Sequence, residues 1–92
     1  MTEHPSTTLG IIGLGYVGLP LAVEAGRAGI RVIGFDVNPS VVDIVNSGES
    51  HIQDVPATHV EKLVEGRCLE ATTDMTRLRE CDVVSICVPT PL

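Results

Sequence analysis

Apolar residues along the chain fall into short runs, separated by longer stretches in which they recur every three or four positions. Four short runs bounded by glycine, proline or polar residues predict β-strands at residues 8–12, 31–35, 69–72 and 82–88. The stretches with spaced apolar residues predict amphipathic helices at 17–28, from 39 until Gly48, at 56–65 and at 75–79. The last apolar run is nearly continuous, which is typical of a parallel strand that is buried on both faces. Residues 1–7 precede this pattern and are expected to form a flexible tail.

Polar residues and glycines mark where the predicted helices begin and end. Asn38, which a proline follows, is expected to cap the second helix, and either Thr73 or Asp74 is expected to cap the short last one. Gly29 is expected to end the first helix in a left-handed conformation. Gly66 is expected to stop the third helix.

The alternation of strands and helices predicts an α/β fold. Right-handed crossovers between parallel strands give the strand order 3-2-1-4, which is part of a doubly wound sheet of the Rossmann type. Because such a sheet has about six strands when it is complete, residues 8–92 are expected to form an incomplete domain. The fourth strand would then have an unpaired apolar edge. We expect this edge to pair with a second copy, with another chain or with further sequence.

The turn after the first strand has the sequence GLGYVG. Gly13 allows a sharp turn, Gly15 removes the Cβ that would block a pyrophosphate, and Gly18 allows helix and strand to pack closely. The helix begins with unpaired N–H groups, those of Tyr16 and Val17 among them, at the positive end of its dipole. Three glycines can also form only a tight turn, but the strand before them and the helix after them favour a nucleotide site.

Asp36 ends the second predicted strand, 21 positions after Gly15. A carboxylate at this place can accept hydrogen bonds from both hydroxyls of an adenosine ribose, and it would repel a 2′-phosphate. Residues 37–41 contain no Arg or Lys that would neutralise such a phosphate. The sequence therefore predicts NAD rather than NADP as the cofactor. The alternative role of Asp36, as a helix cap, is better suited to Asn38.

Composition excludes several classes of partner. The chain has 6 basic and 12 acidic residues, a formal charge of −6, and the basic residues are scattered, so nucleic acid is not an expected partner. No apolar stretch approaches the roughly 20 residues that cross a bilayer, and the first residues do not resemble a secretion signal, so no membrane partner is expected. We therefore expect a cytoplasmic protein.

Cysteines and histidines give no metal or disulfide pattern. Three cysteines, Cys68, Cys81 and Cys87, have neither CxxC spacing nor a nearby histidine pair, and we expect them to be buried free thiols. His51 and His59 flank a loop and a helix start, and no ligand role is expected for them.

Five segments occur in order along the chain: GLGYVGLPLA, GFDVN, NSGESHI, ATTD and CVPTP. Together they resemble the amino-terminal portion of the UDP-glucose/GDP-mannose dehydrogenase family, and the resemblance covers nearly all of residues 9–92. The SGESHI segment is most similar to the branch that acts on UDP-N-acetylhexosamines. The resemblance implies an enzyme of polysaccharide biosynthesis that oxidises the C6 alcohol of a nucleotide sugar to a carboxylate with two NAD in succession, through a thiohemiacetal on a cysteine.

The same resemblance implies roles for individual residues. Gly13, Gly15, Tyr16, Val17 and Gly18 would hold the pyrophosphate of NAD, Asp36 the adenosine ribose, and Thr90 the nicotinamide-side half. Thr90 could also be an ordinary loop hydroxyl. Family members often carry a basic residue soon after the acid of strand two, and this chain has none there.

The resemblance also implies what this chain lacks. The nucleophilic cysteine, the lysine and asparagine that support it, most of the sugar-nucleotide site and the remaining strands lie in downstream segments of the family. None of the three cysteines here occupies the catalytic motif, so the 92-residue chain is expected to contain no catalytic residue, to be inactive alone and to bind a nucleotide sugar only in the full-length protein. A homo-oligomer through the edge of strand four is the partner expected besides NAD.

Two alternatives stay open at this point. The chain could be a stand-alone NAD-binding or assembly module without catalysis, since its short length permits one. Hydroxyacid and 6-phosphogluconate-type dehydrogenases also begin with a similar glycine turn, but their loop after strand four is not expected to read VPTP.

Overall fold

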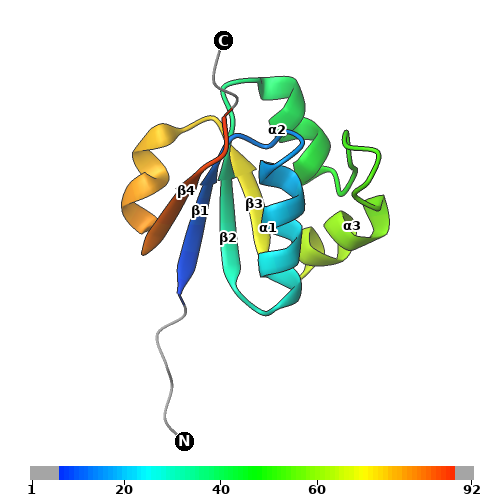
Figure 1. The fold of residues 1–92 in the computed structure, drawn as a ribbon, viewed down its shortest axis with the longest axis horizontal. Helices are drawn as coiled ribbons and strands as arrows, with labels where there is room; N and C mark the ends of the chain where they lie inside the picture. Colours follow the sequence, from blue (N-terminus) through cyan, green and yellow to red (C-terminus); the bar gives the residue numbers. More distant parts are fainter. Residues whose placement is uncertain (1–6, 89–92) are drawn as a thin grey trace, which may run out of the picture.

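The structure is a computed structural model, and it describes residues 7–88. Strands and helices alternate along these residues, as the sequence predicts (Figure 1). The elements in chain order are β1 (Thr8–Ile12), α1 (Gly18–Arg27), β2 (Arg31–Phe35), α2 (Pro39–Asn46), α3 (Ala57–Glu65), β3 (Leu69–Thr72), the 3₁₀ helix η1 (Met75–Glu80) and β4 (Val83–Ile86).

The four strands form one parallel sheet in the order β3-β2-β1-β4, which confirms the predicted topology. The register pairs Ile11 of β1 with Gly34 of β2 and with Ser85 of β4. The strands β1, β2 and β3 have the predicted bounds, whereas β4 is shorter than the predicted 82–88. The flexible tail was expected at residues 1–7, of which residues 1–6 lie outside the described residues.

Helices α1, α2 and α3 gather on one side of the sheet and η1 lies on the other (Figure 1). Side chains alternate between the two faces of a strand, so successive residues of β2 enter different layers. Val32 joins the buried cluster beneath the three helices, together with Ile11 and Leu69. Ile33 and Phe35, which are fully buried, belong to the other face, where the Phe35 ring lies near Gly10 and Cys81. Strands β1 and β2 are thus covered on both sides, whereas β3 is buried on the helix side and has the exposed Glu70 on the other.

The three α-helices end in the same hydrogen-bonded motif. At the end of α1, the Ile30 N–H donates to the Ala25 carbonyl and the Gly29 N–H donates to the Gly26 carbonyl, with Gly29 at φ +92°. This pair of hydrogen bonds is the Schellman motif, which needs a left-handed residue at the first position after the cap. The predicted left-handed Gly29 is therefore confirmed, and Gly48 plays the same part after α2.

The end of α3 differs from the simplest expectation for a glycine stop. Gly66 does cap the helix, but its φ is −79°, and the left-handed residue is Arg67 at φ +60°. The Cys68 N–H donates to the Leu63 carbonyl and the Arg67 N–H to the Val64 carbonyl, so the motif is one residue further along than the glycine. A non-glycine residue in this conformation costs about 1–2 kcal/mol.

The outer edge of β3 is closed by a side chain of α2. In a parallel strand the N–H and C=O of one residue point to the same side, and those of the next residue point to the opposite side. The carbonyls of Cys68 and Thr72 point to β2, where they accept hydrogen bonds. Ala71 therefore points away from the sheet. The Asn46 side chain matches it there: its Nδ2 donates to the Ala71 carbonyl and its Oδ1 accepts from the Ala71 N–H, both at 2.9 Å.

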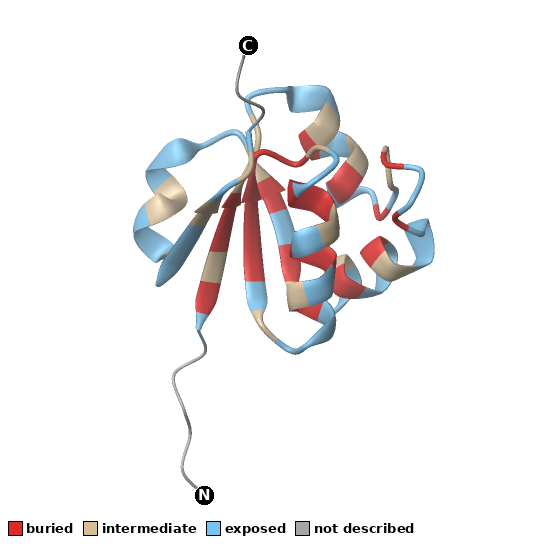
Figure 2. Cartoon of the chain, viewed as in Figure 1, coloured by how far each residue is buried: buried red, intermediate tan, exposed pale blue. Residues whose placement is uncertain are grey.

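The opposite edge, β4, is uncovered, and the expectation that this strand is buried on both faces is wrong for the described residues (Figure 2). Val83, Val84, Ile86 and Val88 are all exposed, Ile86 to 71% of its surface. The continuous apolar run had indicated burial, but among residues 7–88 no α-helix packs closely over this strand. The predicted unpaired apolar edge is present in the structure.

One arginine fastens η1 to the sheet. The Arg77 guanidinium donates to both carboxylate oxygens of Glu70 on β3, at 2.6 and 3.1 Å, and to those of Glu80 at 2.8 and 3.2 Å. These hydrogen bonds lower the pKa of both carboxyls and raise that of the guanidinium. Asp74, one of the two predicted caps, accepts from the Thr76 N–H at the start of η1.

Candidate functional site

The glycine turn lies at the carboxyl end of the sheet, between β1 and α1. Gly13 has φ +98°, a left-handed conformation that glycine adopts at no steric cost. Its N–H donates to the Phe35 carbonyl at 2.7 Å, so the first residue of the turn still belongs to the sheet ladder. The chain then turns sharply out of the strand, as predicted for this glycine.

The other two glycines answer different constraints. A Cβ on Gly18 would lie 1.6 Å from the Gly13 carbonyl oxygen and 3.3 Å from the Ile11 side chain, so no larger residue fits there. A Cβ on Gly15 would meet no atom of the described chain within 4 Å. The protein itself therefore does not require a glycine at position 15, and the open side of the turn is where a ligand can approach the backbone.

The turn presents backbone donors without partners. Among residues 7–88, no hydrogen bond joins the N–H groups of Gly15, Tyr16 or Val17 to another part of the protein. The side chains of Tyr16 and Val17 are 83% and 65% exposed. Helix α1 begins directly after them, without a side-chain cap and without an acidic residue in its first turn. A helix start of this kind can bind an anion through its free N–H groups.

The Asp36 carboxylate lies at the end of β2 and holds two backbone groups. Its Oδ2 accepts from the Leu14 N–H and its Oδ1 from the Asn38 N–H, both at 2.9 Å. It does not cap α2, because the Asn38 side chain does so by accepting from the Ser40 N–H. A carboxylate has about four acceptor positions, so these two bonds leave capacity for the hydroxyls of a ribose.

A histidine that sequence reasoning did not assign to the site also contacts the turn. His51, in the loop between α2 and α3, places its Nε2 2.6 Å from the Leu14 carbonyl oxygen. The contact joins residues 37 positions apart, so no local pattern could have shown it. His59 lies in α3 and lines a hollow with Pro20 and Val23 on α1.

Two hollows adjoin the turn at this end of the sheet. One, of about 390 Å³, is lined by Gly15, Tyr16 and Val17 together with Ile86 at the end of β4 and with Cys87 and Val88 after it. The other, of about 60 Å³, is lined by Gly13, Asp36, Val37, Ile12, Phe35, Met75 and Val88. They place the glycine turn between the end of β4 and the Asp36 carboxylate, as a dinucleotide laid across the turn requires.

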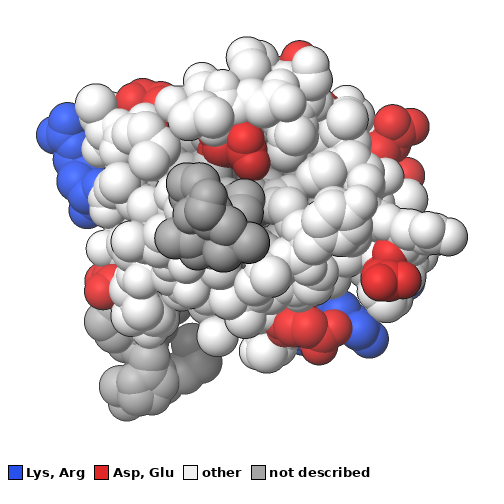
Figure 3. Space-filling view, turned by 45° about the horizontal axis from the view of Figure 1, so that its top comes forward, with Lys and Arg blue, Asp and Glu red and all other residues white. Residues whose placement is uncertain are grey.

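Charged side chains do not supply the anion site. On the face that is turned forward in Figure 3, the visible Lys and Arg side chains lie at the margins, as do most of the acidic side chains, and an acidic patch lies nearer the centre. A diphosphate here would be bound by backbone N–H groups rather than by basic side chains.

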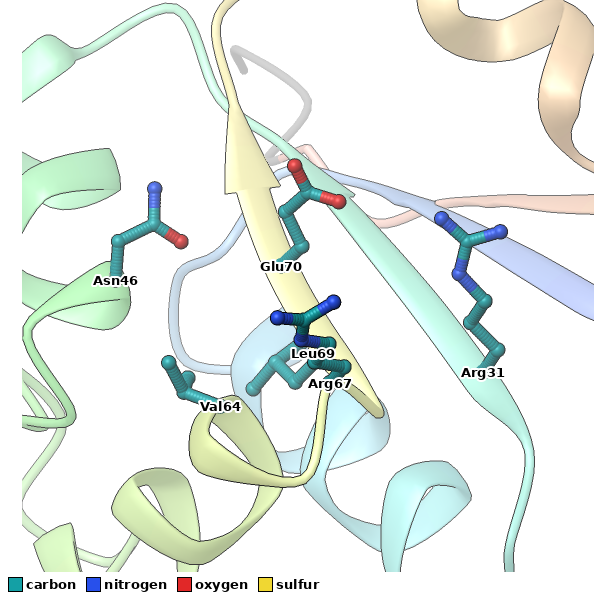
Figure 4. Close-up of a pocket in the computed structure, with 6 residues that line it drawn as sticks. All are labelled: Arg31, Asn46, Val64, Arg67, Leu69 and Glu70. Carbon is teal, nitrogen blue, oxygen red and sulfur yellow. The ribbon is translucent and has the colours of Figure 1, made fainter.

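A larger hollow, of about 610 Å³, lies at the other end of the sheet (Figure 4). Its lining comes from the amino ends of β2 and β3 and from the helices beside them: Arg31, Asn46, Val64, Arg67, Leu69 and Glu70. Ligands of open parallel sheets bind at the carboxyl ends of the strands. This hollow is therefore not the candidate cofactor site, despite its size.

The cysteines are free thiols, as predicted, but they are half-buried rather than buried. Burial, with smaller contributions from the carboxylates of Glu80 and Asp82, raises the pKa of the Cys81 thiol, which makes it a poorer nucleophile. Within the described range no group of three His, Cys, Asp or Glu side chains is arranged to hold a metal ion. No helix of residues 7–88 is long and apolar enough to cross a membrane. Thr90 lies outside the described residues.

The geometry fits a dinucleotide. The space beside Gly15, the free N–H groups of the turn and the acceptor at the end of β2 are the features with which Rossmann-type domains bind the pyrophosphate and ribose of such a cofactor. The chain is thus a dinucleotide-binding domain of this class.

Comparison with known proteins gives the particular family. Residues 7–92 match the UDP-glucose/GDP-mannose dehydrogenase family, NAD binding domain, and the chain belongs to this family. It is similar to UDP-N-acetyl-D-mannosamine dehydrogenase of Salmonella typhimurium, with 46% identity over 86 residues, which are 92% of this chain and 20% of the relative. It is also similar to UDP-N-acetyl-D-glucosamine 6-dehydrogenase of Salmonella typhi, with 42% identity over 91% of this chain and 19% of the relative.

Solved structures agree with this assignment. The GDP-mannose dehydrogenase of Pseudomonas aeruginosa superimposes with a TM-score of 0.85 and 35% identity, over 90% of this chain and 20% of that one. The UDP-D-ManNAc dehydrogenase of Pyrococcus horikoshii gives a TM-score of 0.87 and 32% identity, over 94% and 21%. The chain thus spans about a fifth of the length of the relatives it matches.

Proposed function

We propose that this chain is the NAD-binding, amino-terminal part of a dehydrogenase that oxidises the C6 hydroxymethyl group of a nucleotide sugar to a carboxylate. NAD, when bound, accepts the hydride in each of two successive oxidations. Residues 8–92 would supply the cofactor site, and the nucleophile and most of the substrate site would come from further segments of the protein. The chain spans about a fifth of the length of the relatives it matches, which supports this division.

The proposed cofactor contacts follow from the geometry of the turn. The backbone of Gly13, Gly15, Tyr16, Val17 and Gly18 would hold the pyrophosphate, and Asp36 would accept the ribose hydroxyls. The observation that carries this proposal is the open side of Gly15 beside unpaired N–H groups. Thr90 would contact the nicotinamide-side half of the cofactor, as the family resemblance implies.

NAD rather than NADP is the proposed cofactor, for an electrostatic reason. A 2′-phosphate would approach the Asp36 carboxylate, and the residues that follow, among them Val37 and Asn38, offer no positive charge.

The experiment that tests the cofactor proposal is an NMR titration of the 92-residue chain with NAD⁺ and NADP⁺. Saturable shifts are expected at the amides of residues 13–18 and 36 with NAD⁺, and much weaker ones with NADP⁺. The amides that line the hollow of Figure 4, such as those of Arg67 and Glu70, serve as the internal control and should not move. Shifts confined to that hollow, or none at all, would overturn the proposal.

For the substrate we propose a UDP-N-acetylhexosamine and a place in polysaccharide biosynthesis. Two similar relatives bear names that specify UDP-N-acetyl-D-mannosamine and UDP-N-acetyl-D-glucosamine. A coupled assay of a protein that contains this chain together with the catalytic segments would measure NADH production. Two NADH per sugar are expected with a UDP-N-acetylhexosamine, and faster turnover of UDP-glucose would refute the branch assignment.

For the 92-residue chain itself we propose that a second copy covers β4. Its free edge carries exposed apolar side chains, with Val84 and Ile86 on one face. Sedimentation at rising concentration should show a dimer for the wild type and a monomer for Ile86→Lys. A wild-type monomer at high concentration, with fast amide exchange at residues 83–88, would contradict the proposal.

We also propose a cytoplasmic location, where free thiols such as Cys68 and Cys87 stay reduced.

A further inference from the structure

The His51 ring is held against the glycine turn by a single hydrogen bond. Its Nε2 lies 2.6 Å from the Leu14 carbonyl oxygen, and a carbonyl oxygen can only accept. Nε2 must therefore carry the proton and donate. This contact fixes which of the two neutral forms of the imidazole is present.

The other ring nitrogen of His51 has no partner. Nδ1 is the one side-chain nitrogen or oxygen among residues 7–88 that is buried without a hydrogen bond. With the proton on Nε2, Nδ1 of the neutral ring is an acceptor, and leaving a buried acceptor unpaired is unfavourable. Of the two ring nitrogens only Nε2 has a partner among the described residues, and that partner is the turn.

Asp36 and His51 together hold two successive peptide groups of the turn. Asp36 holds the peptide between Gly13 and Leu14 through its N–H, and His51 holds the peptide between Leu14 and Gly15 through its carbonyl. A trans peptide is planar, with N–H and C=O pointing in opposite directions. The Leu14 carbonyl and the Gly15 N–H belong to the same peptide group. The hydrogen bond from His51 to this carbonyl therefore orients the Gly15 N–H away from the ring.

The Gly15 N–H is the first of the unpaired donors, and the space where a Cβ of this residue would lie is open. We propose that His51 is a positioning residue for the diphosphate of the cofactor: it orients the Gly15 N–H without touching the ligand. This inference rests on the proposed NAD-binding function. It divides the recognition between two side chains, Asp36 for the ribose and His51, acting through the Leu14 peptide, for the diphosphate.

The test uses ligands that contain different parts of the cofactor. Amide NMR titrations of the 92-residue chain with NAD⁺, ADP and adenosine give an affinity for each. His51→Leu removes the donor and should weaken NAD⁺ and ADP about tenfold, the value of one hydrogen bond, while adenosine changes by less than about twofold. His51→Gln, which keeps a donor, should recover most of the loss. His59→Leu is the matched control and should bind all three ligands as the wild type does.

The outcomes separate this inference from the function on which it rests. Failure of the wild type to bind NAD⁺ would overturn both. Wild-type binding of NAD⁺ with equal affinity in His51→Leu would overturn the inference alone. Equal weakening of ADP and adenosine would do the same, because it would indicate a general loosening of the fold.

A measurement on the unmodified chain covers the case in which His51→Leu does not fold. The ring nitrogens of His51 can be observed by ¹⁵N NMR. The Nε2–H form is expected, with a shift that changes when ADP binds and stays constant with adenosine. A ring protonated on Nδ1 alone, or a shift that ADP leaves unchanged, would refute the positioning role.

Discussion

Replacing Asp36 by alanine should impair both the fold and the cofactor site, by amounts that the structure allows us to estimate. The substitution removes the acceptor of two backbone N–H groups, those of Leu14 and Asn38. Leu14 is buried and Asn38 is exposed, so the first loss weighs more. A hydrogen bond to a charged group contributes about 1.5–3 kcal/mol when it is shielded, and we expect a total destabilisation of about 2–3 kcal/mol. For a domain of this size, that lowers Tm by roughly 10–20 °C.

The affinity for NAD should fall for an additional reason. Asp36→Ala also removes the acceptor for the ribose hydroxyls, which corresponds to a loss of roughly ten- to over a hundredfold. Asp36→Asn keeps one carbonyl oxygen in the same place and should lose less stability than the alanine variant. The repulsion of a 2′-phosphate disappears in both variants, so the preference for NAD⁺ over NADP⁺ should narrow.

Calorimetry with NAD⁺ and NADP⁺ would measure these affinities, at a temperature at which circular dichroism shows that each variant is folded. Near-equal NAD⁺ affinity in wild type and Asp36→Ala would refute the assignment of Asp36 to the ribose. A loss that is equal for both cofactors would also count against it, since it would show that Asp36 acts only by holding the turn.

Three further perturbations follow from the structure. Gly15→Ala should leave Tm nearly unchanged and weaken the binding of NAD⁺ about tenfold or more, whereas Gly18→Ala should destabilise the fold by about 3 kcal/mol or more. Scanning fluorimetry measures Tm and calorimetry measures the affinity of both variants, and equal losses of Tm would contradict the prediction. Arg67→Gly should relieve the backbone strain of the left-handed conformation after α3 and raise Tm by about 4–8 °C. Arg67→Ala is the control and should not raise Tm, and a lower Tm for the glycine variant would show that Arg67 is not strained. Arg77 lowers the pKa of Glu70 from 4.5, so its stabilisation is present above that value and is lost as pH falls through the lower folded-state pKa. The stability gap between wild type and Glu70→Gln, below about 1 kcal/mol in urea at neutral pH, should therefore close as pH falls below 4.5. A gap that widens there would have the wrong sign.

The strands and the topology could be predicted because their signals are local. Apolar runs such as 31–35 have the length of a strand and are bounded by polar residues or glycine, and handedness of the crossovers leaves one order for a sheet of this kind. Helix ends were predictable for the same reason where a single residue type suits the geometry, as at Gly29 and Asn38. At α3 the glycine and the left-handed residue are neighbours rather than the same residue, and composition alone does not distinguish the two.

The site could be predicted only in part. The roles expected for Gly13 and Gly18 depend on backbone geometry within the turn, and a local sequence carries that information. The contacts of His51 with Leu14 and of Asn46 with Ala71 join residues 37 and 25 positions apart. Both residues belong to the NSGESHI segment that carries the family resemblance, but that segment does not show which distant residue each of them contacts. The burial of β4 was predicted wrongly. An apolar run indicates that a strand is suited to burial, but it does not show which element covers it.

The Asn46 side chain gives the sheet a direction of growth. By occupying both outward-facing groups of Ala71, it leaves an incoming strand no pair of partners at the middle of β3. On the far side, the outward-facing donors and acceptors of β4 have no partner strand among residues 7–88. A further strand, from whatever source, can therefore pair with the β4 edge of this sheet, whereas the Asn46 amide blocks pairing at the β3 edge.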